Sequence, residues 1–167
     1  MDPSVPPPPA YVHKENAEEH ARLLFEAYRW PDGKPSCPSC GSKRPIYKQT
    51  RKGVAGYYRC PQPHPHPSGE PKPLIFTVRT GTVMSRSHIP LDKWLLCLSW
   101  LSTLESPFWL SSANLLGSRL GVNRKTAASL LKDLEDLRWG DLAADPANAF
   151  LMQMMADERR AKALSSR

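Results

Sequence analysis

The sequence lacks any long run of apolar residues. Its longest such stretch, near residues 95–101, is interrupted by Ser99 and is far too short to span a bilayer. The N-terminus carries four consecutive prolines without the basic region and apolar core of a secretory signal. We therefore expect a soluble cytoplasmic protein with no membrane partner. In that reducing compartment, cysteines are more often metal ligands than disulfides.

Acidic residues are almost absent from the middle of the chain. Residues 34–89 hold ten lysines and arginines and one acidic residue, whereas residues 1–33 hold three basic and six acidic ones. The formal net charge of the whole chain is +7. A positive field this concentrated suits a polyanion, and nucleic acid is the expected partner. A lysine-rich solubilising surface would not explain so uneven a distribution.

Only four cysteines are present, and three of them have the spacing of a metal site. Cys37 and Cys40 share a Cys-Pro-Ser-Cys-Gly turn, and nineteen residues separate Cys40 from Cys60. This spacing is in the zinc-ribbon range, and a histidine after Cys60 can complete a tetrahedral site. His64 is the first choice as fourth ligand, and His66 is the alternative. Four protein ligands leave no open position, so we predict one structural Zn²⁺.

The alternatives for these cysteines are a redox pair and a chance cluster. A redox Cys-x-x-Cys pair would lie where a strand meets a helix in a βαβ pattern, and no such pattern surrounds Cys37. Cys97, the fourth cysteine, lies in an apolar helical pattern and is expected to be an inert core residue.

The patterns together predict a small α+β protein of four segments. A proline-rich tail covers residues 1–14, and a helix followed by a zinc ribbon of short antiparallel strands covers residues 15–89. A helix-turn-helix domain follows at residues 90–140, and a C-terminal amphipathic helix covers residues 141–167.

The first helix opens at Asn16, with Glu19 in a capping-box pattern, and its apolar face is expected to pack on the ribbon. Short strands are expected at residues 46–49, 57–59 and 74–78. A strongly apolar helix from residue 91 to residue 101 is the expected centre of a second small core.

Basic side chains alternate with tyrosines in the predicted strands of the ribbon. Such side chains can grip a phosphate backbone. An equally good explanation is that the tyrosines cover a thin core while the charges are solvated. The predicted phosphate contacts are Lys48, Arg51, Lys52 and Arg59.

A helix-turn-helix pattern follows residue 112. A short helix is predicted to end at Leu120, Gly121 permits the turn, and Asn123 caps a second helix that runs to about Leu137. The basic start of this second helix would enter the major groove. A helical hairpin that does not bind DNA is the alternative. The predicted DNA contacts are Asn123, Arg124, Lys125, Thr126, Ser129 and Lys132.

The last helix carries an apolar stripe behind an N-cap at Asp145 and a proline at the first helical position. A methionine-rich stripe usually docks on its own domain, although methionine also suits a partner helix or a dimer. The residues predicted for partner binding are Phe150, Leu151, Met154 and Met155.

Several short motifs follow one another in a specific order. They are Arg-Trp-Pro-Asp-Gly at 29–33, Cys-Pro-x-Cys-Gly at 37–41, Tyr-Arg-Cys at 58–60, Phe-Thr-Val at 76–78, Thr-Gly-Thr at 80–82, Pro-Leu-x-x-Trp at 90–94, Leu-Gly-Val at 120–122 and Thr-Ala at 126–127. This order resembles the N-terminal part of bacterial insertion-sequence transposases that begin with a zinc ribbon, over about residues 16–138. The resemblance implies that Cys37, Cys40 and Cys60 bind zinc and that the region binds DNA.

Two features depart from that family. Its usual second Cys-x-x-Cys knuckle is replaced by a proline-rich insertion at residues 61–73 that offers the two histidines. We also expect no RNase H-like catalytic domain here, because 27 residues after Gly140 are too few for such a fold. Asp133, Glu135 and Asp136 crowd one predicted helix and cannot form its separated acidic triad.

We therefore expect a non-enzymatic zinc protein that binds double-stranded DNA in the nucleoid, derived from a transposase-like module and acting in transcription regulation. One alternative is an adaptor that binds RNA polymerase or a transcription factor. The other is the DNA-binding subunit of a split transposase. One helix-turn-helix reads only a few base pairs, so a homodimer or a polymerase partner is expected.

Overall fold

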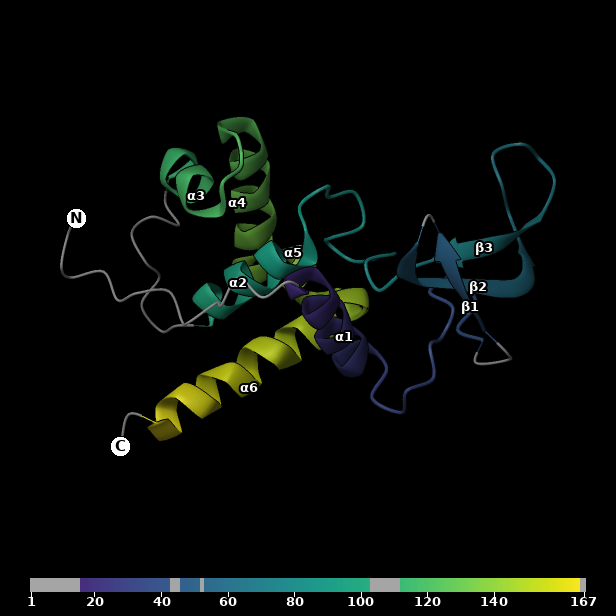
Figure 1. The fold of residues 1–167 in the computed structure, drawn as a ribbon, viewed down its shortest axis with the longest axis horizontal. Helices are drawn as coiled ribbons and strands as arrows, with labels where there is room; N and C mark the ends of the chain where they lie inside the picture. The colour runs from purple at the N-terminus through teal and green to yellow at the C-terminus, as the bar shows by residue number, and fades with distance from the viewer. Residues whose placement is uncertain (1–15, 43–45, 52, 103–111, 166–167) are drawn as a thin grey trace.

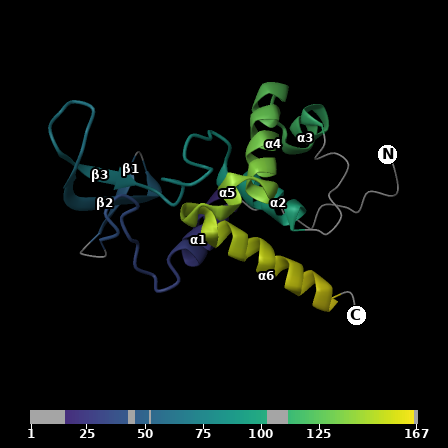
Figure 2. The same ribbon diagram turned by 180° about the vertical axis from the view of Figure 1, so that it is seen from behind.

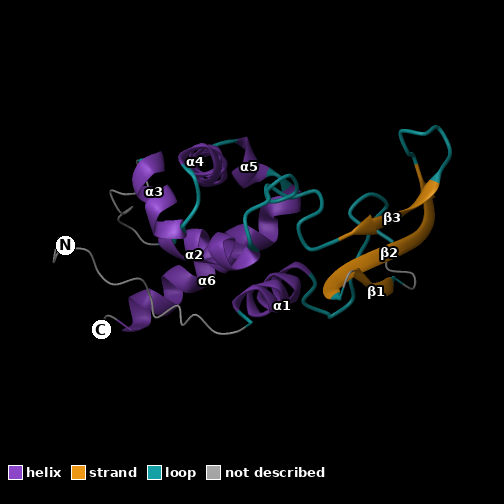
Figure 3. Ribbon diagram, turned by 45° about the horizontal axis from the view of Figure 1, so that its top comes forward, coloured by secondary structure: helices purple, strands orange, loops and turns teal. Residues whose placement is uncertain are grey.

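The computed structural model describes residues 16–42, 46–51, 53–102 and 112–165. A three-stranded antiparallel sheet lies at one end of the molecule, and a body of helices lies at the other (Figure 1, Figure 3). The small α+β class predicted from the sequence is confirmed, with helices forming the larger part.

The sheet has the strand order β1-β2-β3. Strand β1 (Tyr47–Arg51) pairs with β2 (Val54–His64), and β2 pairs with β3 (Lys72–Phe76). Strand β2 is longer than expected, because it continues past Cys60 through two prolines to His64. Its register with β3 shifts between Cys60 and Pro63, and its pairing with β1 ends at Arg59. Pro61 and Pro63 lie at this bulge and beyond the part of β2 that pairs with β1. A proline is tolerated at such positions because it removes no hydrogen bond between strands.

Helix α1 (Ala17–Arg29) connects the two parts. Its buried Ala21 and Phe25 belong to the hydrophobic core, and the helix contacts α2 (Leu91–Leu101) and α6 (Ala149–Ser165). The apolar face therefore packs on helices rather than on the ribbon alone. The polar edge formed by Arg22 and Glu26 lies against the β1–β2 hairpin instead.

The predicted capping box at the start of α1 is wrong. Asn16 is the N-cap residue, but its side chain makes no capping hydrogen bond. The Glu19 carboxylate instead accepts hydrogen bonds from Arg22 one turn further along the helix. The Glu19 carboxylate, which would have completed the capping box, is thus engaged by the charged side chain of Arg22.

Three aromatic rings form the core of the ribbon. Trp30, directly after α1, packs edge-on against Tyr58 of β2 and Phe76 of β3, with ring centroids 5.2 Å and 6.2 Å away. All three side chains are buried. Tyr58 is therefore a core residue, as the thin-core interpretation of the tyrosines expected.

Helix α2 is the centre of the helical body and has the bounds expected from the sequence. Its Trp94 and Cys97 are fully buried, and burial raises the pKa of the Cys97 thiol above its usual range. The inert core role predicted for Cys97 fits this environment. The helix contacts α1, α4 (Arg124–Trp139) and α6.

The two helices predicted for a helix-turn-helix are α3 (Ala113–Leu120) and α4. Gly121 ends α3 with φ of 64°, in the left-handed region that glycine adopts without strain. The Asn123 side chain accepts a hydrogen bond from the Thr126 backbone N–H at 2.8 Å, so the predicted N-cap is confirmed. Helix α4 runs two residues beyond the predicted end.

The C-terminal segment contains α5 (Asp141–Ala144), a 3-10 turn η2 (Pro146–Asn148) and α6, which leads away from the sheet (Figure 2). Asp145 accepts a hydrogen bond from the Ala147 backbone N–H and thereby caps the turn. Of the residues predicted for partner binding, Leu151, Met154 and Met155 are buried in the protein's own core, which is the arrangement in which the stripe docks on its own domain. The remaining member of that prediction, Phe150, is half-buried with its ring beside the Arg29 guanidinium.

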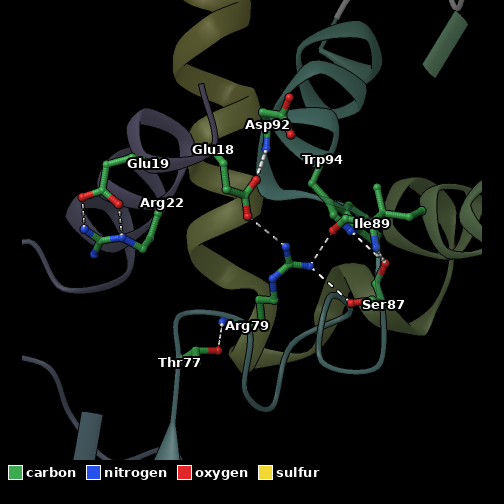
Figure 4. Close-up of polar contacts among 9 residues, drawn as sticks. All are labelled: Glu18, Glu19, Arg22, Thr77, Arg79, Ser87, Ile89, Asp92 and Trp94. Carbon is green, nitrogen blue, oxygen red and sulfur yellow. Dashed lines mark hydrogen bonds and ion pairs between the residues drawn. The ribbon is translucent and has the colours of Figure 1, made fainter. Parts of the chain in front are cut away.

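Two arginines hold the segment after β3 to the helical body. Arg29 donates hydrogen bonds to the carbonyls of Val78 and Thr80. Arg79 donates to the carbonyls of Ser87 and Ile89, the latter at 2.7 Å, as Figure 4 shows.

Glu18 of α1 completes this joint. It forms an ion pair with Arg79 at 3.4 Å and accepts a hydrogen bond from the Asp92 backbone N–H at the start of α2 (Figure 4). Burial lowers the pKa of Arg79, while Glu18 favours its charged form. One carboxylate therefore connects α1, the segment after β3 and α2.

Replacing Gly117 with alanine tests the close packing of α3 on the turn. A Cβ at this position would lie 2.9 Å from the Val122 carbonyl oxygen, which belongs to the backbone and cannot turn aside. Alanine normally favours a helix over glycine by about 1 kcal/mol. We nevertheless expect Gly117→Ala to lower the free energy of unfolding by about 1–3 kcal/mol, measured by urea denaturation. Ser118→Ala, at an exposed position of the same helix, is the control and should change stability by no more than about 0.5 kcal/mol.

Candidate metal centre and nucleic-acid interface

Four side chains from two segments bring their ligand atoms together beside the C-terminal half of β2. Cys37 and Cys40 come from the turn after α1, and Cys60 and His64 come from β2. Their Sγ and ring nitrogen atoms all lie within 4.8 Å of one another. The Cys37 Sγ atom lies 3.6 Å from His64 Nε2, and the Cys40 Sγ atom lies 3.8 Å from Cys60 Sγ.

Local hydrogen bonds shape the first turn. The Gly41 N–H donates to the Cys37 carbonyl at 2.8 Å, and the Cys37 N–H donates to the Ser42 carbonyl at 3.1 Å. Gly41 has φ of 66°, which allows the chain to reverse directly after Cys40. Both thiols therefore point toward the same spot from one rigid turn.

The distances fit a tetrahedral zinc ion. Two sulfur ligands at the usual Zn–S distance of about 2.3 Å lie about 3.8 Å apart in a tetrahedron. The spacing between the Cys40 and Cys60 sulfur atoms is 3.8 Å. The four side chains thus form one zinc-binding group of the structural type, and the predicted cofactor is confirmed.

His64 is held in the orientation that a zinc ligand needs. Its Nε2 atom faces the thiols, and its Nδ1 atom lies 3.2 Å from the Ser39 hydroxyl oxygen. A metal-bound imidazole usually donates its second N–H to such a partner, which fixes the ring and its tautomer. Ser39, inside the Cys-Pro-Ser-Cys turn, therefore supports the histidine from the opposite segment.

His66 lies outside this cluster. It is exposed, and its Nδ1 atom contacts the hydroxyl and the backbone N–H of Ser68 at 2.9 Å and 3.2 Å. The choice between the two histidines follows from the path of β2, because the strand carries His64 back beside the first turn.

The protonation of the thiols makes metal binding sensitive to pH. Burial raises the pKa of the Cys60 thiol to about 11. A hydrogen bond from the Ser42 backbone lowers the pKa of the exposed Cys40 thiol, and the neighbouring thiols add to this. Zinc binds the thiolate and must displace the proton, so acidification weakens zinc binding.

The basic side chains of the ribbon are divided between the two faces of the sheet, because Lys48 is paired with the buried Tyr58 whereas Arg59 is paired with the exposed Tyr47. Arg59 of β2 lies opposite Tyr47 of β1 and Ile75 of β3, and Tyr47 and Ile75 are both exposed. Lys48 and Arg51 are exposed on β1, and the Arg51 guanidinium stacks on the Tyr57 ring at 5.8 Å. The fourth residue predicted to contact phosphate, Lys52, lies outside the described residues.

The predicted DNA contacts lie along α4. Arg124, Lys125, Ser129 and Lys132 are exposed, and Thr126 is half-buried. Asn123 is also exposed, but its side chain is engaged in the helix cap.

A groove of about 560 Å³ lies along one side of α4. Lys125, Thr126 and Ser129 form one wall, and the segment 82–89 forms the other. That segment contributes Arg86 and His88, which sequence reasoning missed. The signal available was their place in the strongly basic stretch 34–89, but the sequence did not show that this segment reaches α4.

Comparison with known proteins bears on the ribbon. Residues 16–62 match the family model described as a transposase zinc-ribbon domain, and the resemblance stated from the sequence is confirmed over these residues. No catalytic domain is detected in the chain. No curated protein and no solved structure matched the chain.

Two further findings concern the described part of the chain outside the ribbon as well as within it. No described helix is both long and apolar enough to cross a bilayer. Within residues 16–42, 46–51, 53–102 and 112–165, the zinc-binding group is the only cluster of three or more metal-ligating side chains.

The two histidines offer a matched test of the ligand set. His64→Ala should lower zinc affinity by about tenfold to a hundredfold or more because it removes a ligand. His66→Ala should bind zinc like the native chain. Zinc content by mass spectrometry and affinity by chelator competition measure both variants. Equal zinc retention by the two would contradict the assignment.

Ser39→Ala isolates the support that His64 receives. The four ligands stay in place, so we expect one zinc ion still to bind, with affinity reduced about tenfold. Ser42→Ala is the control, because the Ser42 contact with Cys37 is made by its backbone carbonyl, which the substitution keeps. An affinity unchanged by Ser39→Ala would show that the hydroxyl does not orient the ring.

Proposed function

We propose that this chain is a zinc-containing, non-enzymatic DNA-binding protein that acts in transcription regulation, in the cytoplasm at the nucleoid. The observation that carries the proposal is the exposed basic start of α4 behind a capped, glycine-based turn. The match of residues 16–62 to a transposase zinc-ribbon domain supports it from a separate part of the chain.

Helix α4 is suited to read base edges. Arg124 and Lys125 occupy its first turn, where a helix-turn-helix places the side chains that enter the major groove. Neither side chain makes a hydrogen bond or an ion pair with another described residue. An arginine at this place can donate two hydrogen bonds to a guanine, and this is a common specific contact.

The ribbon is suited to hold phosphates. Arg51 and Arg59 lie on paired strands, and Arg51 stacks on Tyr57, which shares a face of β2 with Arg59, so the sheet fixes their spacing. Lys48 projects from the opposite face, beside Tyr58, and adds positive charge at the edge of the ribbon. Contacts of this kind position a protein on the duplex without reading its sequence. When bound, zinc supplies a closed cross-link between the two segments of the ribbon.

A DNA-binding subunit of a split transposase is the second candidate. The observation that favours it is the matched domain itself, which is named for transposases. In that case a catalytic subunit would act in trans at element ends.

The adaptor alternative has less support than the other two. Such an adaptor could use the ribbon and the face around Met154, but the Met154 face is buried in the protein's own core. A polymerase or transcription-factor partner would therefore have to bind through the ribbon, and a homodimer would need a surface other than the Met154 face.

Arg124→Ala tests the base-reading role of α4. On a duplex selected for binding from random sequences, we expect a loss of about 1–3 kcal/mol and relaxed preference at one or two positions. Fluorescence anisotropy on the selected and on a scrambled duplex measures both effects. Arg160→Ala, an exposed arginine of α6 paired with Asp157, is the matched control and should change neither.

Unchanged preference in Arg124→Ala would remove α4 as the reader. Genome-wide occupancy by crosslinking and sequencing then separates the candidate functions. Peaks with a shared motif at promoters support the regulator, and peaks at element ends support the split transposase. Signal that follows RNA polymerase without a motif supports the adaptor.

A further inference from the structure

We propose that the groove between segment 82–89 and α4 is a second phosphate-binding site, which holds the backbone of the same duplex that α4 contacts. This inference rests on the proposed DNA-binding function and extends it to a segment outside the helix-turn-helix and outside the matched ribbon.

Positive charge reaches the groove from both walls through Arg86 and Lys125, and the His88 imidazole lies on the same wall as Arg86. Arg86 and His88 come from segment 82–89, and Lys125 comes from the first turn of α4. Thr126 and Ser129 add two hydroxyl groups, and Asp133 is the only acidic residue among those that line it in the described part of the chain.

The positive charges of Arg86 and Lys125 are not paired within the described part of the protein. Arg86, His88 and Lys125 are exposed, and none makes a side-chain hydrogen bond or an ion pair with another described residue. Arg79, by contrast, is engaged with Glu18 and two carbonyls. Unpaired positive charges that converge on one polar groove favour an anionic ligand.

Segment 82–89 is held in place before any ligand arrives. Arg79 binds the Ser87 and Ile89 carbonyls, and the Ser87 hydroxyl accepts a hydrogen bond from the Trp94 indole N–H at 3.1 Å (Figure 4). At its start, the Val83 N–H donates to the Asn148 side chain at 2.9 Å. Arg86 and His88 are thus presented from a fixed backbone, which lowers the entropic cost of binding.

The position of the groove favours a DNA backbone over a small free anion. Lys125, Thr126 and Ser129 belong both to the groove and to the proposed recognition face of α4. A strand that follows the edge of the major groove beside α4 would place its phosphates against segment 82–89. The exposure of Arg86, His88 and Ser129 leaves the groove open to a long polymer.

The test measures binding of a fluorescein-labelled duplex of mixed sequence by anisotropy over a range of salt concentrations. Loss of one phosphate contact in Arg86→Gln should reduce the slope of log affinity against log salt by about 0.9 and weaken binding about fivefold to tenfold at 0.1 M salt. Asp133→Asn removes the groove's carboxylate and should tighten binding about twofold to threefold. Arg160→Gln should change neither slope nor affinity, because Arg160 lies on α6 away from the groove.

The outcomes separate this inference from the proposed function. If the native chain binds the duplex and Arg86→Gln leaves the slope unchanged, the groove site is wrong while DNA binding stands. If the native chain does not bind any duplex, both proposals fall. Because Arg86 has no side-chain partner among the described residues, its variant should keep the native thermal midpoint, which shows that a loss of binding is not a loss of folding.

Discussion

The convergence of four zinc ligands is the constraint on which the ribbon depends. Two come from a turn after α1 and two from β2, so the site closes a loop of the chain that contains strand β1. The buried aromatic core beside it consists of Trp30, Tyr58 and Phe76. So small a core stabilises little by burial alone, and metal binding then contributes directly to folding.

The ribbon is attached to the helices by polar contacts as well as by packing. Arg29 and Arg79 together satisfy four backbone carbonyls between residues 78 and 89, a stretch that has no strand or helix to do so. Buried carbonyls without partners would be costly, so these arginines stabilise one path of the chain. The same path sets the orientation of the basic strands relative to α4 and brings Arg86 to its groove.

Several features that depend on short stretches of sequence were predicted correctly. Cysteine spacing identified three ligands, and the glycine and asparagine of the turn placed both helices of the helix-turn-helix. The sequence could not decide between His64 and His66, because the answer depends on β2 continuing through prolines past a bulge. Nor could it show that the methionine stripe is buried or that segment 82–89 faces α4, since both follow from how helices pack in three dimensions.

The groove also bears on how α4 can approach DNA. Lys125 and Ser129 face segment 82–89 across the groove, whereas Arg124 and Lys132 are not among the residues that line it. A duplex that contacts Lys125 as well as the proposed base-reading Arg124 would pass close to Arg86 and His88. If segment 82–89 did not bind the DNA backbone, it would obstruct the docking of α4. Close approach of the duplex would then remove water from unpaired charged side chains without any compensating contact, which costs free energy. The proposed phosphate binding by segment 82–89 would resolve this conflict, because the same close approach would then add contacts that stabilise the complex.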